Sequence, residues 1–401
     1  MDVKTGSIAG VLVLAMAVSA LAARIPAGTQ IQIRLTTEVN SSTAKAGQTF
    51  EALVIAPVVA NNRIVMAAGV TLAGHVTAAT AVQPDDQAIL ALAFDRIRDA
   101  GGIKSAVAAK LVSIDNARES LDSQGRIQGI VASKTGSGRL DQGINKVAEK
   151  YPGFADILGT VKQAVLKAPD ANIDYKPGVE MTIELTKPMD WNGTVNVPNV
   201  SAILPQEGLF QLVNRQPFRT ETQEGGKPSD VTNLMFLGTA QELTDAFQKA
   251  GWSVAAKLNG ASKLETFRAM AENRGYQEAP VSVLLLDGQP PDLAFEKTND
   301  TFAARHHLRI WRRPGQFGGQ AVWVCAATHD TGIDFSDQQR TFIHKIDSHI
   351  DLERAKVVND ILLTGMVRGL SLVDRAAMPD NMSNATGDAL ITDGAMAVIR
   401  F

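Results

Sequence analysis

From residue 24 onward, polar and apolar residues alternate in short runs, and this period constrains the fold more than any other feature of the chain. The run QIQIRL at residues 30–35 places an apolar side chain at every second position, which is typical of a strand with one buried face. Glycines punctuate the later runs as turns. Those runs are residues 51–59, 64–66, 70–76, 90–98 and 103–114. We therefore predict an all-β barrel domain over residues 23–198.

The first of these strands has an echo 150 positions later in the chain. The segment MTIEL at residues 181–185 follows Gly178 much as residues 30–35 follow Gly28, and both end in Leu-Thr. Strands with the same pattern of polar and apolar residues have similar surroundings, so we predict that these two belong to one sheet. A late strand that pairs with an early one closes the sheet and removes edges that would otherwise be open.

A different pattern separates the two echoing strands. Residues 133–139 are rich in glycine and serine, and residues 140–150 and 154–167 follow the helical period. In the second of these segments Ile157, Val161 and Val165 share one face. We predict a helical insertion at about residues 133–170 within the barrel domain.

The early strands also carry a family resemblance. Three segments resemble the small β-barrel of TrbI-like conjugation-channel proteins and related envelope proteins, namely PAGTQIQIRL, AGQTFEA and AAGVTLAGHV. The resemblance covers residues 24–80 most directly. It implies assembly or scaffolding in the cell envelope rather than catalysis.

The first 23 residues have the features of a secretory signal peptide. Lys4 supplies a positive charge, residues 8–22 are an apolar run, and Ala20-Leu21-Ala22 is the small-x-small pattern that a signal peptidase recognises. The run is shorter than the roughly 20 residues that span a bilayer. We predict a signal peptide at residues 1–22 and a mature protein of the periplasm or cell envelope, with no transmembrane span after cleavage. An uncleaved N-terminal anchor is the alternative.

Length and composition exclude several classes of protein. A chain of 401 residues predicts two to three domains. A net charge of −3 and an aromatic content of 5% exclude a generally basic nucleic-acid coat and a base-stacking platform, so we expect no nucleic-acid partner. The single cysteine, Cys325, excludes an intrachain disulfide. The sequence also lacks the motifs of P-loop, α/β-hydrolase and dinucleotide-binding enzymes.

The second half of the chain mixes helices and strands. Residues 199–227 have the polar composition of a linker, and residues 228–401 lack a regular β-α-β order, which predicts an α+β domain. The expected strands are 233–237, 281–286, 293–297, 305–313 and 321–328, and the expected helices are 239–250, 262–273 and 351–363. Residues 389–391 and 395–401 are expected to form a hairpin around Asp393-Gly394.

This half resembles the LssY C-terminal domain family over residues 228–401, at PSDVTNLMFLGTAQELTDAFQKAGW, RHHLRIWR, VWVCAATHDTGI and HKIDSHIDLERAKVVNDIL. The resemblance implies an association with secretion-system or envelope components. Family members sometimes lie beside lipid-phosphatase-type membrane domains, which this sequence lacks. The family pattern falls here on His307, Arg309, Trp311, Asp330, His344, Asp351, Glu353 and Arg354.

The register of one predicted hairpin decides which of these side chains meet. Successive side chains of a strand point to opposite faces, and a core favours aliphatic side chains on the same face. One face is then predicted to hold Leu308, Ile310, Val322 and Val324. The opposite face is predicted to hold His307, Arg309, Trp311, Trp323 and Cys325, and to line a cleft, because polar groups are costly to bury without partners.

Three kinds of site can be built from these residues, and a structural explanation competes with them. The candidates for acid–base catalysis are His307, Asp330, His344 and Asp351. A divalent metal such as Zn²⁺ or Mn²⁺ would take His307, His344, Asp347 and Asp351. An anion would be held by His306, Arg309, Arg312 and Arg313, and the remaining ligand-binding candidates are Trp311, Trp323, Glu353 and Arg354. The structural explanation is a capping box from Ser348 to Asp351 at the start of a helix.

Two functions follow from this pattern. The first is an exported cell-envelope protein that binds or assembles with an envelope protein or a small anionic ligand. The second is a metal-assisted hydrolase that acts on a phosphorylated or envelope-derived substrate through the cluster of His307, His344 and acids. The cofactor of the first function is unknown, and the second requires a divalent metal.

We predict that the exported protein begins at or near Ala23, because the cleavage pattern ends at Ala22. N-terminal sequencing of protein from a periplasmic fraction checks this. Recovery of a chain that retains Met1 in the membrane fraction contradicts it and supports the anchor instead.

Overall fold

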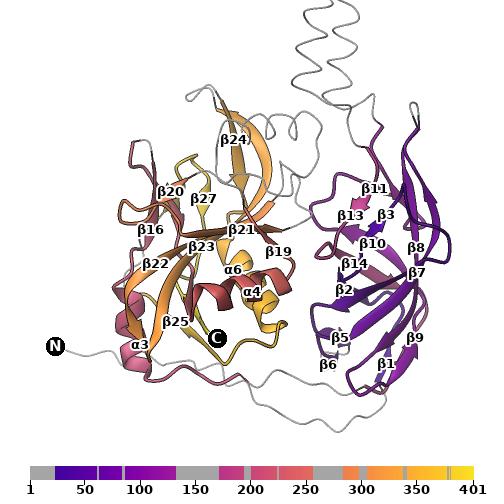
Figure 1. The fold of residues 1–401 in the computed structure, drawn as a ribbon, viewed down its shortest axis with the longest axis horizontal. Coiled ribbons are helices and arrows are strands. Elements are labelled where there is room, and N and C mark those ends of the chain that lie inside the picture. The colour runs from indigo at the N-terminus through magenta and orange to yellow at the C-terminus, as the bar shows by residue number, and fades with distance from the viewer. Residues whose placement is uncertain are drawn as a thin grey trace, which may run out of the picture.

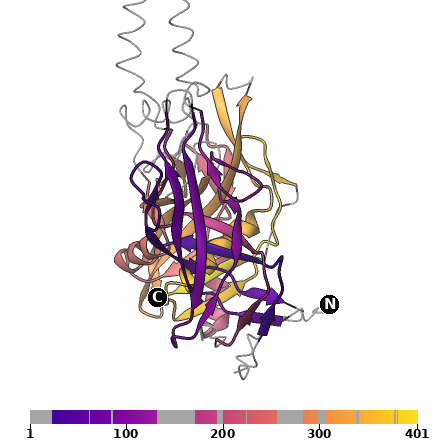
Figure 2. The same ribbon diagram turned by 90° about the vertical axis from the view of Figure 1, so that its right-hand side faces the viewer.

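The computed structural model describes residues 23–60, 63–83, 86–131, 171–193, 200–223, 225–255, 283–297, 305–336, 341–376, 379 and 381–401, without the side chains of 63 and 332–344. The signal segment, the helical insertion expected at 133–170 and the helix expected at 262–273 lie outside these residues. The described chain forms an N-terminal barrel and a C-terminal sheet with helices, side by side (Figures 1 and 2).

The described part of the N-terminal domain is built from strands. They are β1 (Ala23–Ile25), β2 (Gln30–Leu35), β3 (Val39–Asn40), β4 (Thr49–Val54), β5 (Val58–Ala60), β6 (Arg63–Met66), β7 (Thr71–Thr80), β8 (Ile89–Arg98), β9 (Lys104–Ala106), β10 (Ala109–Ile114), β11 (Ser120–Leu121), β12 (Ile127–Gln128), β13 (Asp174–Tyr175), β14 (Glu180–Leu185) and β15 (Met189–Trp191). The main sheet runs β10-β14-β2-β4-β7-β8-β12-β11, and β9 also pairs with β8. Because the chain passes from β9 directly into β10, the sheet curls into a nearly closed barrel.

The predicted partnership of the two echoing strands is confirmed. β2 and β14 are antiparallel neighbours, with Ile33 opposite Met181 and Ile31 opposite Ile183. These four side chains are buried in one apolar cluster that fills the barrel. Because apolar residues alternate in the same way in both strands, the apolar face of each strand points into the barrel core.

The C-terminal domain is a mixed sheet with helices, as the predicted α+β class requires. Its helices are α3 (Gln206–Asn214), α4 (Ala240–Lys249) and α6 (Ile350–Leu362). Its strands are β16 (Arg219–Thr222), β17 (Pro228–Val231), β18 (Leu234–Leu237), β19 (Trp252–Val254), β20 (Leu284–Leu285), β21 (Leu293–Lys297), β22 (Arg305–Phe317), β23 (Gln320–Ser336), β24 (Thr341–Ile346), β25 (Gly369–Val373), β26 (Met382–Ser383), β27 (Ala389–Leu390) and β28 (Met396–Arg400). The large sheet runs β19-β21-β22-β23-β18-β28-β25, with β24 paired to β23.

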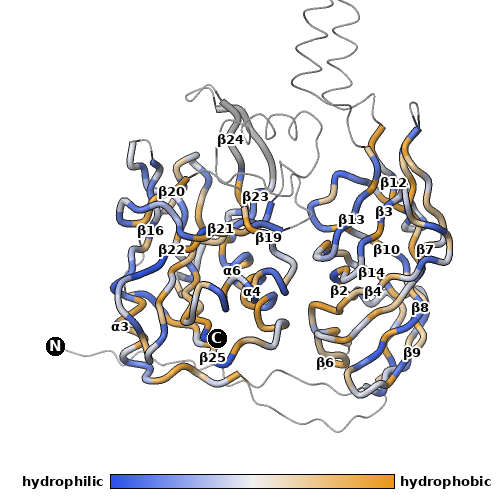
Figure 3. Tube along the Cα trace, in the orientation of Figure 1, coloured by the Kyte–Doolittle hydropathy of each residue, from blue (hydrophilic) through white to orange (hydrophobic). Residues whose placement is uncertain are grey.

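Both faces of this sheet are covered. Helices α4 and α6 pack on the face turned toward the barrel, where Phe247 and Val357 share a cluster with Leu308 (Figure 1). Helix α3 packs on the opposite face, where Leu209 and Val213 join a second cluster. The hydropathy colouring in Figure 3 shows apolar segments concentrated along these buried elements. A sheet with two covered faces has no solvent side, so its buried polar residues need partners within the domain or in the barrel.

Two details differ from the sequence predictions. The expected hairpin at the C-terminus is wrong: β27 pairs with β26, while β28 lies between β18 and β25. The four residues 396–399 are all buried, and a continuous apolar run suits a central strand better than an exposed hairpin. The stretch 199–227, expected to be a linker, holds α3 and β16, and the apolar side of α3 is part of the C-terminal core.

We predict that Gly74→Ala destabilises the barrel. A Cβ at this position in β7 would lie 2.3 Å from the carbonyl oxygen of Ala93 and 2.5 Å from the ring of Phe50. Overpacking of this kind lowers the free energy of unfolding by about 1–3 kcal/mol. The control is Gly101→Ala, whose Cβ would meet nothing closer than 3.4 Å. Urea unfolding of both variants checks the difference, and equal stabilities contradict it.

Candidate functional site

The register of the β22–β23 hairpin differs from the predicted one by one residue. Ile310 lies opposite Cys325 and Trp311 lies opposite Val324. Leu308 and Ile310 therefore share their face with Trp323 and Cys325, whereas His307, Arg309 and Trp311 share theirs with Val322 and Val324. The prediction is wrong because it assumed one apolar face and one open face. Each face has its own apolar layer, so aliphatic side chains are divided between the two.

The face of His307 carries a buried polar cluster rather than an open cleft. Arg309 Nη1 donates to Asp230 Oδ2 at 3.1 Å, and Arg305 donates to Asp330 Oδ2 at 3.1 and 3.2 Å. His307 Nδ1 lies 3.7 Å from Asp330 Oδ2. All five side chains belong to buried residues. Burial raises the pKa of Asp230 and of Asp330, and the nearby arginines offset this only in part.

The remaining candidates from this hairpin are engaged separately. Trp311 Nε1 donates to the carbonyl of Gln289, and Trp323 Nε1 donates to the carbonyl of Gly238. The guanidinium of Arg312 lies 5.4 Å from the ring of Trp323. Arg313 pairs with Asp287. The structure thus distributes these residues over the sheet rather than gathering them at one anion site.

The metal candidates are also dispersed, so far as the described side chains show. Asp351 accepts hydrogen bonds from Thr392 Oγ1 at 2.8 Å and from the backbone of Asp393 at 2.6 Å. Asp347 accepts from the backbone of His349. His344 lies in β24, and its side chain is outside the description. Within the described part of the chain, no three His, Cys, Asp or Glu side chains are placed to hold a metal ion.

Helix α6 directs its two neighbouring charged residues in different directions. Arg354 forms two hydrogen bonds of 2.7 Å with Asp393, whereas Glu353 turns toward His306. The predicted capping box is wrong, because the helix begins after His349 with no side-chain cap. The capping box that does form is at α4, where Thr239 and Glu242 satisfy each other's backbone N–H groups.

A group of buried charges lies where α6 meets the barrel. Arg34 of β2 and Glu180 of β14 are cross-strand neighbours, and Arg34 Nη2 donates to Glu180 Oε1 at 2.7 Å. Lys297 of β21 also donates to Glu180 Oε1 at 2.7 Å, and Lys356 of α6 donates to its other oxygen. Asp360 of α6 completes the group by accepting from Arg34 and pairing with Lys297. We call these five residues the Glu180 network.

The Glu180 network is buried, and its pKa shifts follow from its geometry. The side chains are 1–9% exposed, apart from Lys356 at 20%. Burial alone would raise the pKa of Glu180, but Lys297, Lys356 and Arg34 outweigh it and hold that pKa well below its usual range. The same balance lowers the pKa of Asp360. Both carboxylates are therefore charged at neutral pH.

A second polar contact joins the domains beside this network. His306 Nδ1 lies 2.7 Å from Glu353 Oε2, and His306 Nε2 lies 3.0 Å from Asp115 of the barrel. The ring of His329 stacks on His306 at 4.0 Å and reaches Asn116 of the barrel. Burial lowers the pKa of His306, but Glu353 and the hydrogen bond to Asp115 outweigh it and raise the pKa to about 10.

The described buried apolar clusters lie within the domains and do not join one domain to the other. Each described apolar cluster consists of residues of one domain only. At the junction the backbones approach closely instead: a Cβ on Gly251 would lie 2.8 Å from the Cα of Gly178. Asn359 also donates to the carbonyl of Ile55. In the described residues the junction is thus a polar interface with tight backbone contact.

Sequence reasoning identified part of this junction and missed the rest. Glu353 and His306, which contact each other, were among the ligand candidates, whereas Asp115 of the barrel was not. Arg34, Glu180, Lys297, Lys356 and Asp360 were not singled out. Each is an ordinary charged residue in a strand or helix, and no local spacing connects residues up to 326 positions apart.

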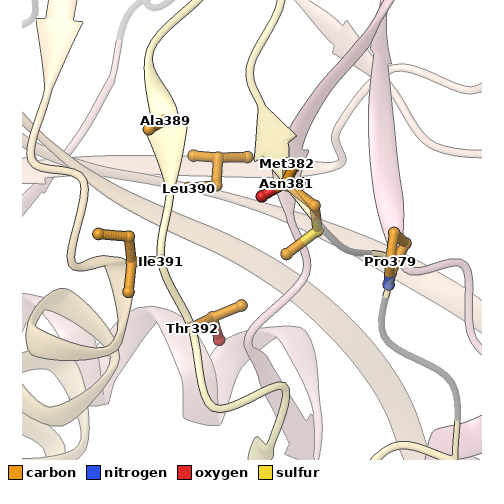
Figure 4. A pocket seen from close by; sticks show the side chains of 7 residues that line it. All are labelled: Pro379, Asn381, Met382, Ala389, Leu390, Ile391 and Thr392. Carbon is orange, nitrogen blue, oxygen red and sulfur yellow. The ribbon is translucent and has the colours of Figure 1, made fainter.

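A separate cavity of about 290 Å³ lies near β26 and β27 (Figure 4). Its lining is mainly apolar and consists of Pro379, Asn381, Met382, Ala389, Leu390, Ile391 and Thr392. None of the residues proposed from the sequence lines it.

Comparison with known proteins places the C-terminal domain. Residues 212–396 match the family model described as LssY C-terminus. The predicted resemblance to this family is confirmed for the α+β domain. A search of curated proteins gave no match.

Among solved structures, ComB10 of the Com type IV secretion system of Helicobacter pylori matches with 12% identity and a TM-score of 0.24. The match covers 43% of this chain and 95% of that one. In the part of the chain that the structure describes, no helix has both the length and the apolarity to cross a membrane.

We predict that Glu180→Gln destabilises the protein far more than Glu184→Gln. The first change leaves Arg34, Lys297 and Lys356 buried with one carboxylate fewer, and breaking a buried pair lowers stability by about 3–5 kcal/mol. Glu184, on the same strand, forms a partly exposed pair with Lys110 that is worth about 0–1 kcal/mol. Denaturant unfolding checks the contrast. Similar losses in both variants contradict a buried network.

We predict that the stability contributed by His306 is lost at alkaline pH. Its pKa in the folded protein is about 10, above the ordinary 6.5, so the contribution is complete below pH 6.5 and disappears as the pH rises through 10. The stability difference between the wild type and His306→Gln should shrink over that range. Urea unfolding at several pH values measures it, with His75→Gln, a surface variant, as control. A constant difference contradicts the prediction.

Proposed function

We propose that the protein is an exported cell-envelope component in which the barrel and the LssY C-terminal-type domain act together as one binding or assembly unit. The observation that carries this proposal is the Glu180 network. It joins two strands of the barrel to one strand and one helix of the C-terminal domain through buried charges. Export rests on the signal-like segment, and the envelope role rests on the family resemblances.

A buried charge network is suited to fixing geometry. Desolvation offsets most of the attraction between buried ions, so such a network adds less stability than its contacts suggest. Its energy depends strongly on the relative positions of the charges, because a carboxylate displaced from its partners is left buried and unpaired. Two modules connected in this way hold one arrangement, which is what a scaffold or a composite binding surface requires.

Burial favours binding over hydrolysis as the function. His307 is 4% exposed and Asp330 is 2% exposed, and both lie within the polar cluster of the C-terminal domain. A catalytic acid–base pair must come within hydrogen-bonding distance of its substrate. The Glu180 network, in contrast, contains residues of both domains, which is what a joint binding or assembly unit requires.

We predict that the wild-type chain unfolds in one cooperative transition, because the domains are coupled through the Glu180 network. Charge reversal by Glu180→Lys should separate this into two transitions, whereas Glu184→Lys, at the partly exposed pair with Lys110, should not. Differential scanning calorimetry measures both. Independent unfolding of the two domains in the wild type contradicts the unit.

The cellular part of the proposal needs its own test. In the bacterium that produces the protein, a tagged wild-type chain should be recovered from the periplasmic or envelope fraction in a cross-linked complex. The complex should be lost with Glu180→Lys and kept with Glu184→Lys, at equal protein levels. A cytoplasmic monomer contradicts the proposal. Phosphomonoester hydrolysis by purified protein with Zn²⁺ or Mn²⁺, abolished by His307→Ala, replaces it with the hydrolase.

A further inference from the structure

Two lysines of the C-terminal domain converge on a carboxylate that belongs to the other domain. Lys297, at the end of β21, donates to Oε1 of Glu180 in β14, and Lys356, in α6, donates to Oε2 of the same carboxylate. Lys297 also donates to the carbonyl of Ala250 at 3.1 Å, which fixes the direction of its ammonium group. Glu180 thus sits between two positioned cations as a bound ligand would.

Among the described residues, Asp360 is an acid of the C-terminal domain that lies beside these lysines. Asp360 lies 3.0 Å from Lys297, but it also accepts from Trp252 Nε1 at 2.9 Å and from Arg34 of the barrel. Glu180 of the barrel is the carboxylate that both ammonium groups contact, and it comes from outside the domain.

The contacts that hold Glu180 in place are of a kind that a free anion can replace. The apolar clusters of the described residues each belong to one domain, and the contacts across the junction include ion pairs, hydrogen bonds and a glycine–glycine approach. Ammonium groups bind phosphate and carboxylate oxygens by the same charge-assisted hydrogen bonds. The main advantage of Glu180 is its attachment, which gives it a high effective concentration at the site.

We propose that Lys297 and Lys356 form an oxyanion-binding site of the LssY C-terminal-type domain, which Glu180 of the barrel fills as a tethered competitor. An acidic group of a ligand or partner, carboxylate or phosphate, takes this position when β14 moves away from α6. The inference rests on the proposed function, since it assigns a ligand class to the binding unit. It also makes the barrel a regulator of that site.

The first test removes the competitor in the full-length chain. Glu180→Ala leaves both lysines without the barrel carboxylate, and it is titrated with sodium phosphate or sodium acetate against sodium chloride of equal ionic strength. Thermal unfolding should show a saturable rise in Tm of about 2–4 °C or more, because a ligand that binds only the folded state stabilises it. A stronger response to phosphate assigns a phosphoryl group, and an equal response to acetate assigns a carboxylate.

Two further variants show whether the lysines bind the anion. Glu180→Ala combined with Lys356→Met, which keeps the apolar stem and removes the charge, should lose the response. Glu184→Ala, on the exposed part of the same strand, should never show it. A response that survives Lys356→Met, or that chloride reproduces, overturns the site.

The wild type tests the competition itself. It should respond to the same anion at a concentration at least about tenfold higher, since only the fraction with Glu180 displaced can bind. Hydrogen exchange of residues 180–185 should rise as the anion binds. This measurement also decides the question if Glu180→Ala does not fold. Exchange that phosphate and acetate leave unchanged overturns the inference, whereas a chain that still unfolds in one transition keeps the proposed function.

Discussion

The carboxylate of Glu180 is the point on which the arrangement of the two domains depends. It receives hydrogen bonds from Arg34 of its own barrel and from two lysines of the C-terminal domain, all in a buried setting. Each of these cations would be left unpaired if the carboxylate moved away, and uncompensated buried charge is strongly unfavourable. The junction is therefore specific in its geometry even though apolar packing does not extend across it in the described residues.

The second constraint is that the C-terminal sheet is covered on both faces. Helices α4 and α6 occupy one face, and α3 with the small sheet β17-β16-β20 lies toward the other. Polar residues of β22 and β23 consequently divide into two groups. His307, Arg309 and Asp330 are paired within the domain, whereas His306 and His329 emerge beside the barrel and contact Asp115 and Asn116.

This division explains why adjacent histidines have different surroundings. His306 and His307 are neighbours in the chain, but consecutive side chains of a strand point to opposite faces. His306 is bonded between two carboxylates, one from each domain, and His307 lies near Asp330 and Thr328. A candidate site drawn from sequence proximity alone would merge two groups that the sheet keeps apart.

Local patterns in the sequence determined much of the fold. The alternation of residues 30–35 and 181–185 was sufficient to predict that β2 and β14 share a sheet, because inward apolar faces must meet in one core. The family resemblance of the C-terminal domain and most of its strands and helices could also be predicted from the sequence. The tertiary structure alone decided the register of β22 against β23, since a period of two shows that a side chain faces one way without showing what covers that face. It alone also brought Arg34 and Glu180 to Lys297, Lys356 and Asp360, because charge pairing between distant segments leaves no periodic signal in either one.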